Sequence, residues 1–424
     1  MPIFDQGYQH WTGRLSGHAT RWLAITRHGV RALSSVRMVR LLMLLAWLPA
    51  IALVAFLALW GLLEQRSEAV LGLLRNILPR EIIASPQEFR SAVWTVAYSF
   101  FFRFELFAAV LIVLVVGPGL VSRDLRFNAF PLYFSRPLRR FDFFFGMWGV
   151  SAAFLAAVVI VPAVAAYLIG LAFSLDLKII GETHRVLWGS ILHGLVIAVS
   201  AGTLMLALSS LSRRSIYVGL AWAGFCILTL MISGILIGLR IGAESRRVVD
   251  DAIAKWVAEN PPPPGITLRG SVPIPSRVAR PGGARTAEDD ERDRWMGRWS
   301  EQFNRAHGRA MAEQQDSQRN DWRPIVGYTN NLTRIGDWLL DTDRAWVTFG
   351  RAIEGTRSRL GPAAQMQAGG RLPREVTGPA NDRLFADRLL WQFPVWWSFA
   401  ALAGLWLLSV AVLRTRVKSL DRLK

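Results

Sequence analysis

The sequence lacks the residues and motifs on which several kinds of catalytic and metal site depend. It contains a single cysteine, Cys226, so one chain can form neither a disulfide framework nor a cysteine-based metal site. None of its four lysines follows a glycine, and without a Gly-Lys pair the chain cannot form a standard phosphate-binding loop. Neither H-E-x-x-H nor G-x-S-x-G occurs, and the six histidines show no metal-ligand spacing. We therefore expect no enzymatic activity, no metal and no cofactor bound by this chain.

The net charge of +18 comes without the signatures of a nucleic-acid-binding protein. No zinc-finger pattern, RNA-binding signature or lysine-rich tail accompanies the 49 basic residues, so nucleic acid is not expected among the partners. The first 38 residues are polar and basic, with no short apolar segment followed by a cleavage site. No cleavable signal is therefore expected, and the first apolar run is expected to serve as an anchor.

Apolar residues are abundant, and they gather in long runs. They make up 52% of the chain and form blocks of ~20 residues or more, the length that a helix needs to cross a ~30 Å hydrocarbon core. Pro49 is expected to kink the first run, and Pro162 to kink the third without splitting it. We predict an all-α polytopic membrane protein with six transmembrane helices: Leu41–Leu63, Val96–Val121, Phe141–Leu175, Val186–Leu211, Ile216–Leu239 and Phe393–Leu413.

Basic residues are unevenly distributed among the segments that join and flank these spans. The segments on the proposed inner side carry 18 basic and four acidic residues, whereas the two short loops on the other side carry six of each. The positive-inside rule then predicts that both termini are cytoplasmic, with tails at 1–40 and 414–424. The expected location is the inner membrane of a bacterium, with membrane lipids among the partners. Thr20–Leu33 predicts an amphipathic helix on the inner leaflet, whose apolar stripe is Trp22, Leu23, Ile25, Val30 and Leu33.

The segment between the fifth and sixth spans, 240–392, is the longest that joins two spans. It carries 24 basic and 20 acidic residues, counted from Arg240 to Phe393, and long loops cross the membrane largely regardless of charge. We predict a large extracytoplasmic loop that forms a lid of packed helices. Its expected helices are Ala243–Asn260, Ala287–Gln318 and Asn331–Leu360, and its expected extended or disordered linkers are 261–283 and 361–382.

The segment RDLRFNAFPLYFSRPLRRFDFFFG, Arg123–Gly146, joins the second and third spans and is rich in arginine and aromatic residues. It carries five arginines, eight aromatic residues and two prolines. Proline limits it to short, stiff helical pieces, aromatic side chains can serve as buried anchors, and arginine pairs with carboxylates. Two interpretations remain open: docking to a protein partner in the cytoplasm, or a basic aromatic belt at the lipid headgroups.

In this layout, the stretch GPGLVSRDLRFNAFPLYFSRPLRRFDFFFGM resembles the signature of the type-2 exporter permeases of the ATP-binding-cassette (ABC) transporters. Met147 stands where that family usually has lysine. The positions that match are Asp124 at the acidic position, Ser135-Arg136-Pro137, Arg139, Arg140 and Gly146.

The resemblance implies a permease subunit that pairs with a second copy of itself or with a sister permease. It would bind cytoplasmic ABC ATPase subunits, which would hold ATP and Mg, and its coupling segment, 122–142, would link their motion to substrate movement. The large outer loop leaves a mechanical alternative open, in which the chain acts on an envelope partner without solute flux. The residues expected at the ATPase interface are Arg123, Asp124, Arg126, Phe127, Phe130, Pro131, Tyr133, Phe134, Arg136, Pro137, Arg139 and Arg140.

Two charged residues interrupt the second span, and one histidine lies in the fourth. Arg103 and Glu105 are two positions apart, so they point to opposite sides of a helix and cannot simply neutralise each other. They could lie near the outer boundary or line a substrate pathway, and His193 could pack against a neighbouring helix or serve the same pathway. A third alternative is an intramembrane enzyme that uses Glu105 or His193. Close helix packing is expected at Gly170, Gly194, Ser200, Gly202 and Ser209.

Overall fold

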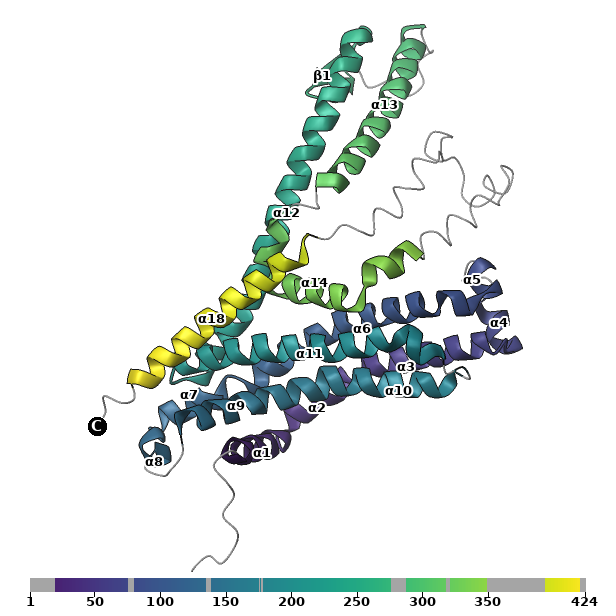
Figure 1. Ribbon diagram of the computed structural model, residues 1–424. Coiled ribbons are helices and arrows are strands. Elements are labelled where there is room, and N and C mark those ends of the chain that lie inside the picture. The colour runs from purple at the N-terminus through teal and green to yellow at the C-terminus, as the bar shows by residue number, and fades with distance from the viewer. Residues whose placement is uncertain are drawn as a thin grey trace, which may run out of the picture.

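The computed structural model shows a bundle of long helices from which a helical arm projects (Figure 1). It describes residues 20–74, 80–134, 139–174, 176, 178–275, 287–317, 321–348 and 393–419. Six helical stretches are long and apolar enough to cross a membrane: Arg37–Glu64, Pro86–Arg126, Phe141–Phe173, Lys178–Leu211, Ser215–Glu259 and Val395–Arg416. The prediction of a mainly α-helical chain with six apolar spans is therefore confirmed. The linker predicted at 361–382 lies outside the described residues.

The first span is divided by a short break. Helix α2 (Arg37–Ala46) ends and α3 (Leu48–Glu64) begins on either side of Trp47. Pro49 lies in the first turn of α3, where backbone N–H groups have no acceptor within the helix, so a proline there costs no helical hydrogen bond. The kink expected at Pro49 is therefore observed as the start of a new helix. Three short helices flank this span: α1 (Arg21–Ser34), α4 (Glu68–Leu74) and α5 (Arg80–Ala84).

The third span is continuous but contains a π turn. It consists of α9 (Arg140–Leu155), the π-helical turn η2 (Ala156–Ile160) and α10 (Val161–Phe173). Pro162 cannot donate a backbone hydrogen bond, and the π turn before it accommodates the proline without ending the helix. The Trp47 indole N–H donates to the carbonyl of Ala157 at 3.2 Å. In an α-helix the N–H at position 162 would donate to the carbonyl of residue 158, so the indole supplies a donor one residue away from the carbonyl that the proline leaves without one.

The remaining spans complete the bundle. Side-chain packing is close where glycine faces a bulky neighbour: a Cβ on Gly170 would meet Trp94, and one on Gly194 would meet Ile160. Tight packing at these glycines, and at Gly202 against Trp148, confirms the expectation from the sequence. The helices are α6 (Pro86–Val116), α11 (Lys178–Leu211), α12 (Ser215–Glu259) and α18 (Val395–Ser419), and α12 and α18 lie at an angle to the others in Figure 1.

The arm is an extension of the fifth span. Helix α12 runs without interruption for 45 residues, and α13 (Ala287–Ser317) lies beside its far half (Figure 1). The two helices share a small apolar core of Val249, Ile253, Ala306 and Ala310. This arm projects away from the bundle, so it does not form the lid that the sequence predicts.

A β-hairpin joins the two helices of the arm, inside the predicted linker 261–283. Strands β1 (Ile266–Arg269) and β2 (Val272–Pro275) pair antiparallel around Gly270 and Ser271. Gly270 has φ +65°, which a two-residue hairpin turn requires and glycine adopts without strain. The extended form that the linker prediction allowed is therefore found at 266–275, but the strand pairing was not predicted, because four prolines precede the hairpin and obscure its alternating apolar residues.

Candidate functional site

A compact turn joins the second and third spans at one end of the bundle. Helix α7 (Gly119–Arg126) continues the line of α6, the chain reverses at Asn128 with φ +51°, and α8 (Phe130–Phe134) follows. The hydroxyl of Ser209 on α11 holds the start of this turn. It accepts hydrogen bonds from two backbone amides of α7 and donates to the carbonyl of Pro118 at 3.0 Å.

Two of the predicted interface aromatics are turned inward. The Phe130 ring is 3% exposed and lies 5.4 Å from the ring of Phe143, centroid to centroid. The Tyr133 hydroxyl donates to Asp124 at 3.3 Å, and burial together with that carboxylate raises the pKa of Tyr133. These contacts help to fix the shape of the turn: Phe130 is buried and is not available to a partner as an anchor, whereas Tyr133 is half-buried.

Other side chains of the turn remain at the surface. The exposed fraction is 74% for Phe127, 65% for Leu132 and 73% for Phe141, so these three large apolar groups lie at the surface among arginines. The exposed members of the predicted interface are Arg123, Arg126, Phe127, Pro131 and Arg139. Arg136, Pro137 and the side chains of Phe134 and Arg140 lie outside the described residues. We call the group Arg123, Arg126, Phe127, Leu132, Arg139 and Phe141 the exposed turn.

Helix α1 packs against α9 beside the exposed turn. The Thr26 hydroxyl donates to the carbonyl of Gly146 at 2.9 Å, and a Cβ at Gly146 would lie 2.8 Å from that of Ile25. Trp22 meets Phe145 edge to face, whereas Leu23 of the predicted stripe is 51% exposed. The stripe therefore divides between contact with α9 and an exposed edge.

The opposite end of the bundle is held by a buried ion pair that the sequence did not suggest. The Arg90 guanidinium donates two hydrogen bonds of 2.8 Å to Glu64, and both side chains are buried. The Trp60 indole also donates to Glu64 at 2.7 Å. Glu182 and Asp176 approach the same guanidinium at 3.3 and 3.7 Å. This network ties α3 and α6 to the connection between α10 and α11.

Arg103 and Glu105 point to opposite sides of α6, as their spacing predicts. Glu105 lies near the midpoint of the Pro86–Arg126 stretch and is 0% exposed, with no hydrogen-bond partner for either oxygen in the described part of the chain. Glu105 therefore faces the interior of the bundle. Arg103 is exposed, and its guanidinium lies 5.7 Å from the centre of the Phe100 ring.

His193 is buried between α11 and a segment of the predicted outer loop. Its Nε2 is 3.1 Å from the carbonyl oxygen of Leu332, and its ring centre is 4.8 Å from that of Phe102. Gly336 faces the imidazole so closely that a Cβ there would overlap it. The packed interpretation fits His193, because no hydrogen bond or ion pair joins it to Arg103 or Glu105 among the described side chains.

The partner of His193 is α14 (Tyr328–Leu340), which lies alongside α11 and α6 (Figure 1). The hydroxyls of Tyr328 and Ser200 are 2.9 Å apart at one end of α14. At its other end, Arg185 donates to the Trp338 carbonyl at 3.2 Å. Helix α14 therefore runs antiparallel to α11 over about 15 Å, the rise from Tyr328 to Trp338 at 1.5 Å per residue.

The chain that leads into α14 descends along α12. Arg240 pairs with Asp321 at 3.0 Å, and the Ser233 hydroxyl donates to the carbonyl of Arg323 at the start of η4 (Arg323–Val326). Residues 321–340 thus enter the bundle beside α12 and leave it beside α11, and we call them the re-entrant segment. Non-helical backbone at this depth is tolerated where protein surrounds it. The sequence indicated an apolar stripe here but placed it in an outer lid.

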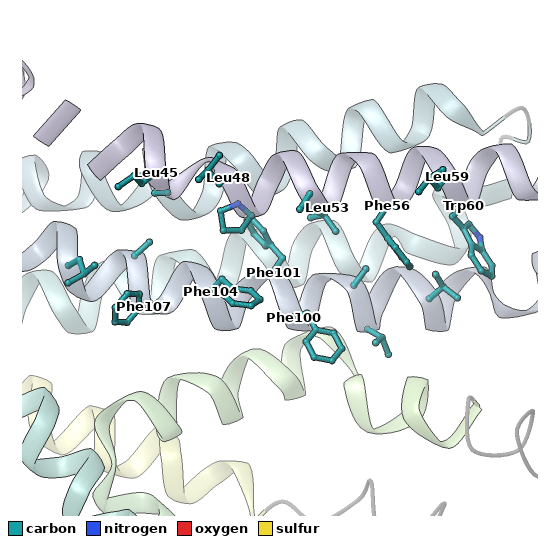
Figure 2. Close-up of a pocket in the computed structure, with 18 of the residues that line it drawn as sticks. Leu45, Leu48, Leu53, Phe56, Leu59, Trp60, Phe100, Phe101, Phe104 and Phe107 are labelled. Carbon is teal, nitrogen blue, oxygen red and sulfur yellow. The ribbon is translucent and has the colours of Figure 1, made fainter. Parts of the chain in front are cut away.

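A long apolar groove lies between α2–α3 and α6, with a volume of about 940 Å³. Figure 2 shows its labelled side chains, which come from these two sides. Its lining is entirely uncharged: Leu42, Leu45, Ala46, Leu48, Pro49, Ala52, Leu53, Phe56, Leu59, Trp60, Leu74, Val93, Val96, Ala97, Phe100, Phe101, Phe104, Phe107, Ala108 and Leu111. The sequence did not reveal this groove, because its two walls come from separate spans.

The described residues contain no cluster of three or more metal-ligating side chains. Comparisons with protein-family models, with curated proteins and with solved structures find no match for this chain. The geometry described above leaves three candidate sites: the exposed turn, the re-entrant segment and the apolar groove.

Proposed function

We propose that this chain is the membrane-spanning permease subunit of an ATP-driven ABC exporter of the bacterial inner membrane. The observation that carries the proposal is the exposed turn, which presents three large apolar side chains among arginines at one end of a six-span bundle. An uncovered patch of this kind indicates a protein or membrane partner. The signature sequence through the turn favours a cytoplasmic ABC ATPase, and a second permease copy would complete the transporter.

The contacts around the exposed turn suggest how motion would pass through it. Phe130 packs on Phe143 of α9, and Tyr133 bonds to Asp124 of α7, so α8 is attached to both spans that it joins. Ser209 fastens the same turn to α11. A force on α8 would therefore reach three spans at once. ATP and Mg would be bound by the ATPase, and this chain would supply the docking surface and the path for the substrate.

Co-purification tests the docking assignment. We expect a tagged chain expressed in its source organism to retain a Walker A ATPase, and Phe127→Ala with Arg126→Glu to reduce that yield at least tenfold, as expected for loss of an interface anchor. Arg213→Glu, an exposed change at the α11–α12 connection, is the matched control and should retain the ATPase. Absence of any ATPase from the wild-type preparation, or equal retention by all variants, would refute the proposal.

Labelling of an introduced cysteine tests the orientation. Asn128 is exposed at the tip of the turn and Cys226 is buried, so Asn128→Cys provides a single accessible thiol. We expect a membrane-impermeant reagent to reach it in inverted vesicles and not in intact cells. Labelling from outside intact cells would place the exposed turn on the wrong side for a cytoplasmic ATPase.

The arm supports the second candidate function, a mechanical subunit that acts on an envelope partner. Helix α12 is one helix from the bundle to the end of the arm, so movement of the fifth span would displace the arm. Vesicles containing the complete assembly separate the two functions. ATP-dependent accumulation of a solute supports the exporter, whereas ATP turnover without flux for any tested solute supports the mechanical subunit.

A further inference from the structure

Glu105 on α6 is a buried carboxyl group without a partner. Its side chain is 0% exposed, and neither oxygen forms a hydrogen bond or an ion pair within the part of the chain that the structure describes. Neither oxygen borders a space that could hold a water molecule. An isolated carboxylate in such surroundings is far costlier than the uncharged acid, because nothing replaces the water that it loses. Glu105 therefore carries a proton in this conformation.

Glu105 faces the π turn of the third span. The Tyr98 hydroxyl donates to the carbonyl of Ala163 at 2.9 Å, and α6 runs antiparallel to α10. Glu105 lies seven residues beyond Tyr98, close to two turns, so it is on the same side of α6 and about 10 Å further along at 1.5 Å per residue. Seven residues before Ala163 the third span reaches Ala156, the first residue of η2, and η2 contacts α6 directly.

Two spans are interrupted at the level of Glu105. The π turn interrupts the third span, and Trp47 separates α2 from α3 in the first. The hydrogen bond from the Trp47 indole to Ala157 joins the two interruptions. Helix α11 closes another side, since a Cβ on Gly194 would meet Ile160 at the end of the π turn. A helix bends most readily where its hydrogen-bond ladder is already irregular, so the walls around Glu105 can separate here.

No charged side chain of the surrounding helices neutralises Glu105. The residues of η2 are all apolar, and α2 and α9 carry charges only within their first four positions. Arg103 points to the opposite side of α6, where it lines a small hollow with Asp337 of α14. His193 of α11 directs its Nε2 at the carbonyl of Leu332. The other inward-facing titratable side chains on the helices around α6 form no bond to Glu105 either: Tyr167 on α10, Cys226 on α12, Glu64 on α3, and Tyr328 and Arg334 on α14.

We propose that Glu105 is a reversible proton-binding site, and that its proton keeps the bundle closed around the π turn. When the helices separate there, water reaches the carboxyl group. The O–H bond then breaks, the proton passes to water, and the electron pair stays on the carboxylate. On closure the carboxylate takes a proton back before it is buried. A proton is the occupant that fits, because the closed site has room for neither a metal ion nor a water molecule.

The geometry also gives the sign of the pH effect. The closed form holds a proton that a water-exposed glutamate releases at neutral pH, so the open form binds fewer protons than the closed form. The closed form therefore loses stability as pH rises through the neutral range, and the ratio of closed to open chains falls about tenfold for each pH unit. Glutamine at position 105 stays neutral at every pH and should remove this dependence.

Infrared spectroscopy tests whether the proton is present. The full-length chain in lipid nanodiscs is compared at neutral pH with Glu105→Gln. We expect a carboxylic-acid C=O band in the wild type that this variant lacks. Glu88→Gln is the matched control, because Glu88 is exposed on the same helix, so its replacement should leave the band unchanged. A wild-type spectrum without a band attributable to Glu105 would overturn the proposal.

Hydrogen exchange in the same nanodiscs tests the link to opening. The protection of the amides at 156–161, relative to their intrinsic exchange rates, should fall about tenfold per pH unit above neutrality in the wild type and in Glu88→Gln. It should stay level in Glu105→Gln, and so should the protection of the amides at 60–64, at the far end of α3.

Three outcomes of the exchange experiment would contradict the proposal. They are a flat profile at 156–161 in the wild type, an equal fall at 60–64, and an equal fall in Glu105→Gln. If that last fall is lost in His193→Gln, the proton belongs to His193 instead. The proposal stands apart from the proposed function, since the measurements use no ATP and no ATPase and their failure would leave the exporter assignment untouched.

Discussion

Replacing Arg90 by alanine tests how strongly the buried ion pair stabilises its end of the bundle. The Arg90 side chain is 2% exposed and the Glu64 side chain 7%, so solvent screens their two 2.8 Å bonds little. Removing one partner of such a pair leaves the other charge buried, at a cost of ~3–5 kcal/mol. The Trp60 N–H would still bond to Glu64, so we expect a loss of about 3 kcal/mol in the free energy of unfolding, the lower end of that range.

Titration of the purified chain in micelles with a denaturing detergent, followed by circular dichroism, would measure this loss. Glu182→Ala is the matched control, because Glu182 is 43% exposed and its ion pair should contribute ~1 kcal/mol or less. The double change Arg90→Met with Glu64→Leu should recover much of the loss, since neither charge stays buried. A loss below ~1 kcal/mol for Arg90→Ala, or an equal loss for Glu182→Ala, would refute the reasoning.

Three further predictions concern other contacts. Gly146→Leu should detach α1 from α9 and speed tryptic cleavage within α1, whereas Gly234→Leu, where the added Cβ meets open space, should cleave at the wild-type rate; equal rates would contradict the packing. Trp47→Phe removes the donor to the π turn and should cost ~0.5–1.5 kcal/mol in the same detergent titration, and no measurable loss would argue against that role. Burial raises the pKa of Asp343, so folding favours its neutral form; the resulting stability is complete below the ordinary value of ~3.9 and is lost as pH rises through the raised pKa. The protection of the amides at 342–348, relative to their intrinsic exchange rates, should therefore fall with pH over that interval in the wild type and change less in Asp343→Asn.

The spans and their irregularities were predictable from the sequence because they depend on local chemistry. Runs of apolar residues identify the six spans, and Pro49 and Pro162 each produce an irregularity within a turn or two of the proline. The form of each irregularity depends on its surroundings. The π turn, for example, is completed by Trp47, which lies 110 residues away from the carbonyl that it contacts.

The features that sequence reasoning missed depend on contacts between distant segments. The stripe of Leu332, Ile335 and Leu339 indicates an amphipathic helix, but the same pattern would suit a lid or a segment buried against α11. Its depth follows from contacts such as that of His193 with Leu332, 139 residues apart. The Arg90 network likewise joins groups that approach only when three spans end at the same level.

Likewise, the inward rotation of Phe130 could not be read from the composition of the exposed turn. Composition identified a segment rich in rings and arginine, and both Phe127 and Phe130 fitted an outward-facing anchor. In the structure Phe127 is 74% exposed and Phe130 only 3%. The difference arises from α9, whose Phe143 offers an apolar contact on one side of α8 alone.

The unbroken course of α12 makes it a lever. Its 45 residues span about 68 Å at 1.5 Å per residue, so a tilt of about 10° about its first residue would move its last by about 12 Å. The paired helix α13 would travel with it, because the two share a core. A small rotation inside the bilayer would thus become a wide sweep at the hairpin, where Val272 and Ile274 are exposed.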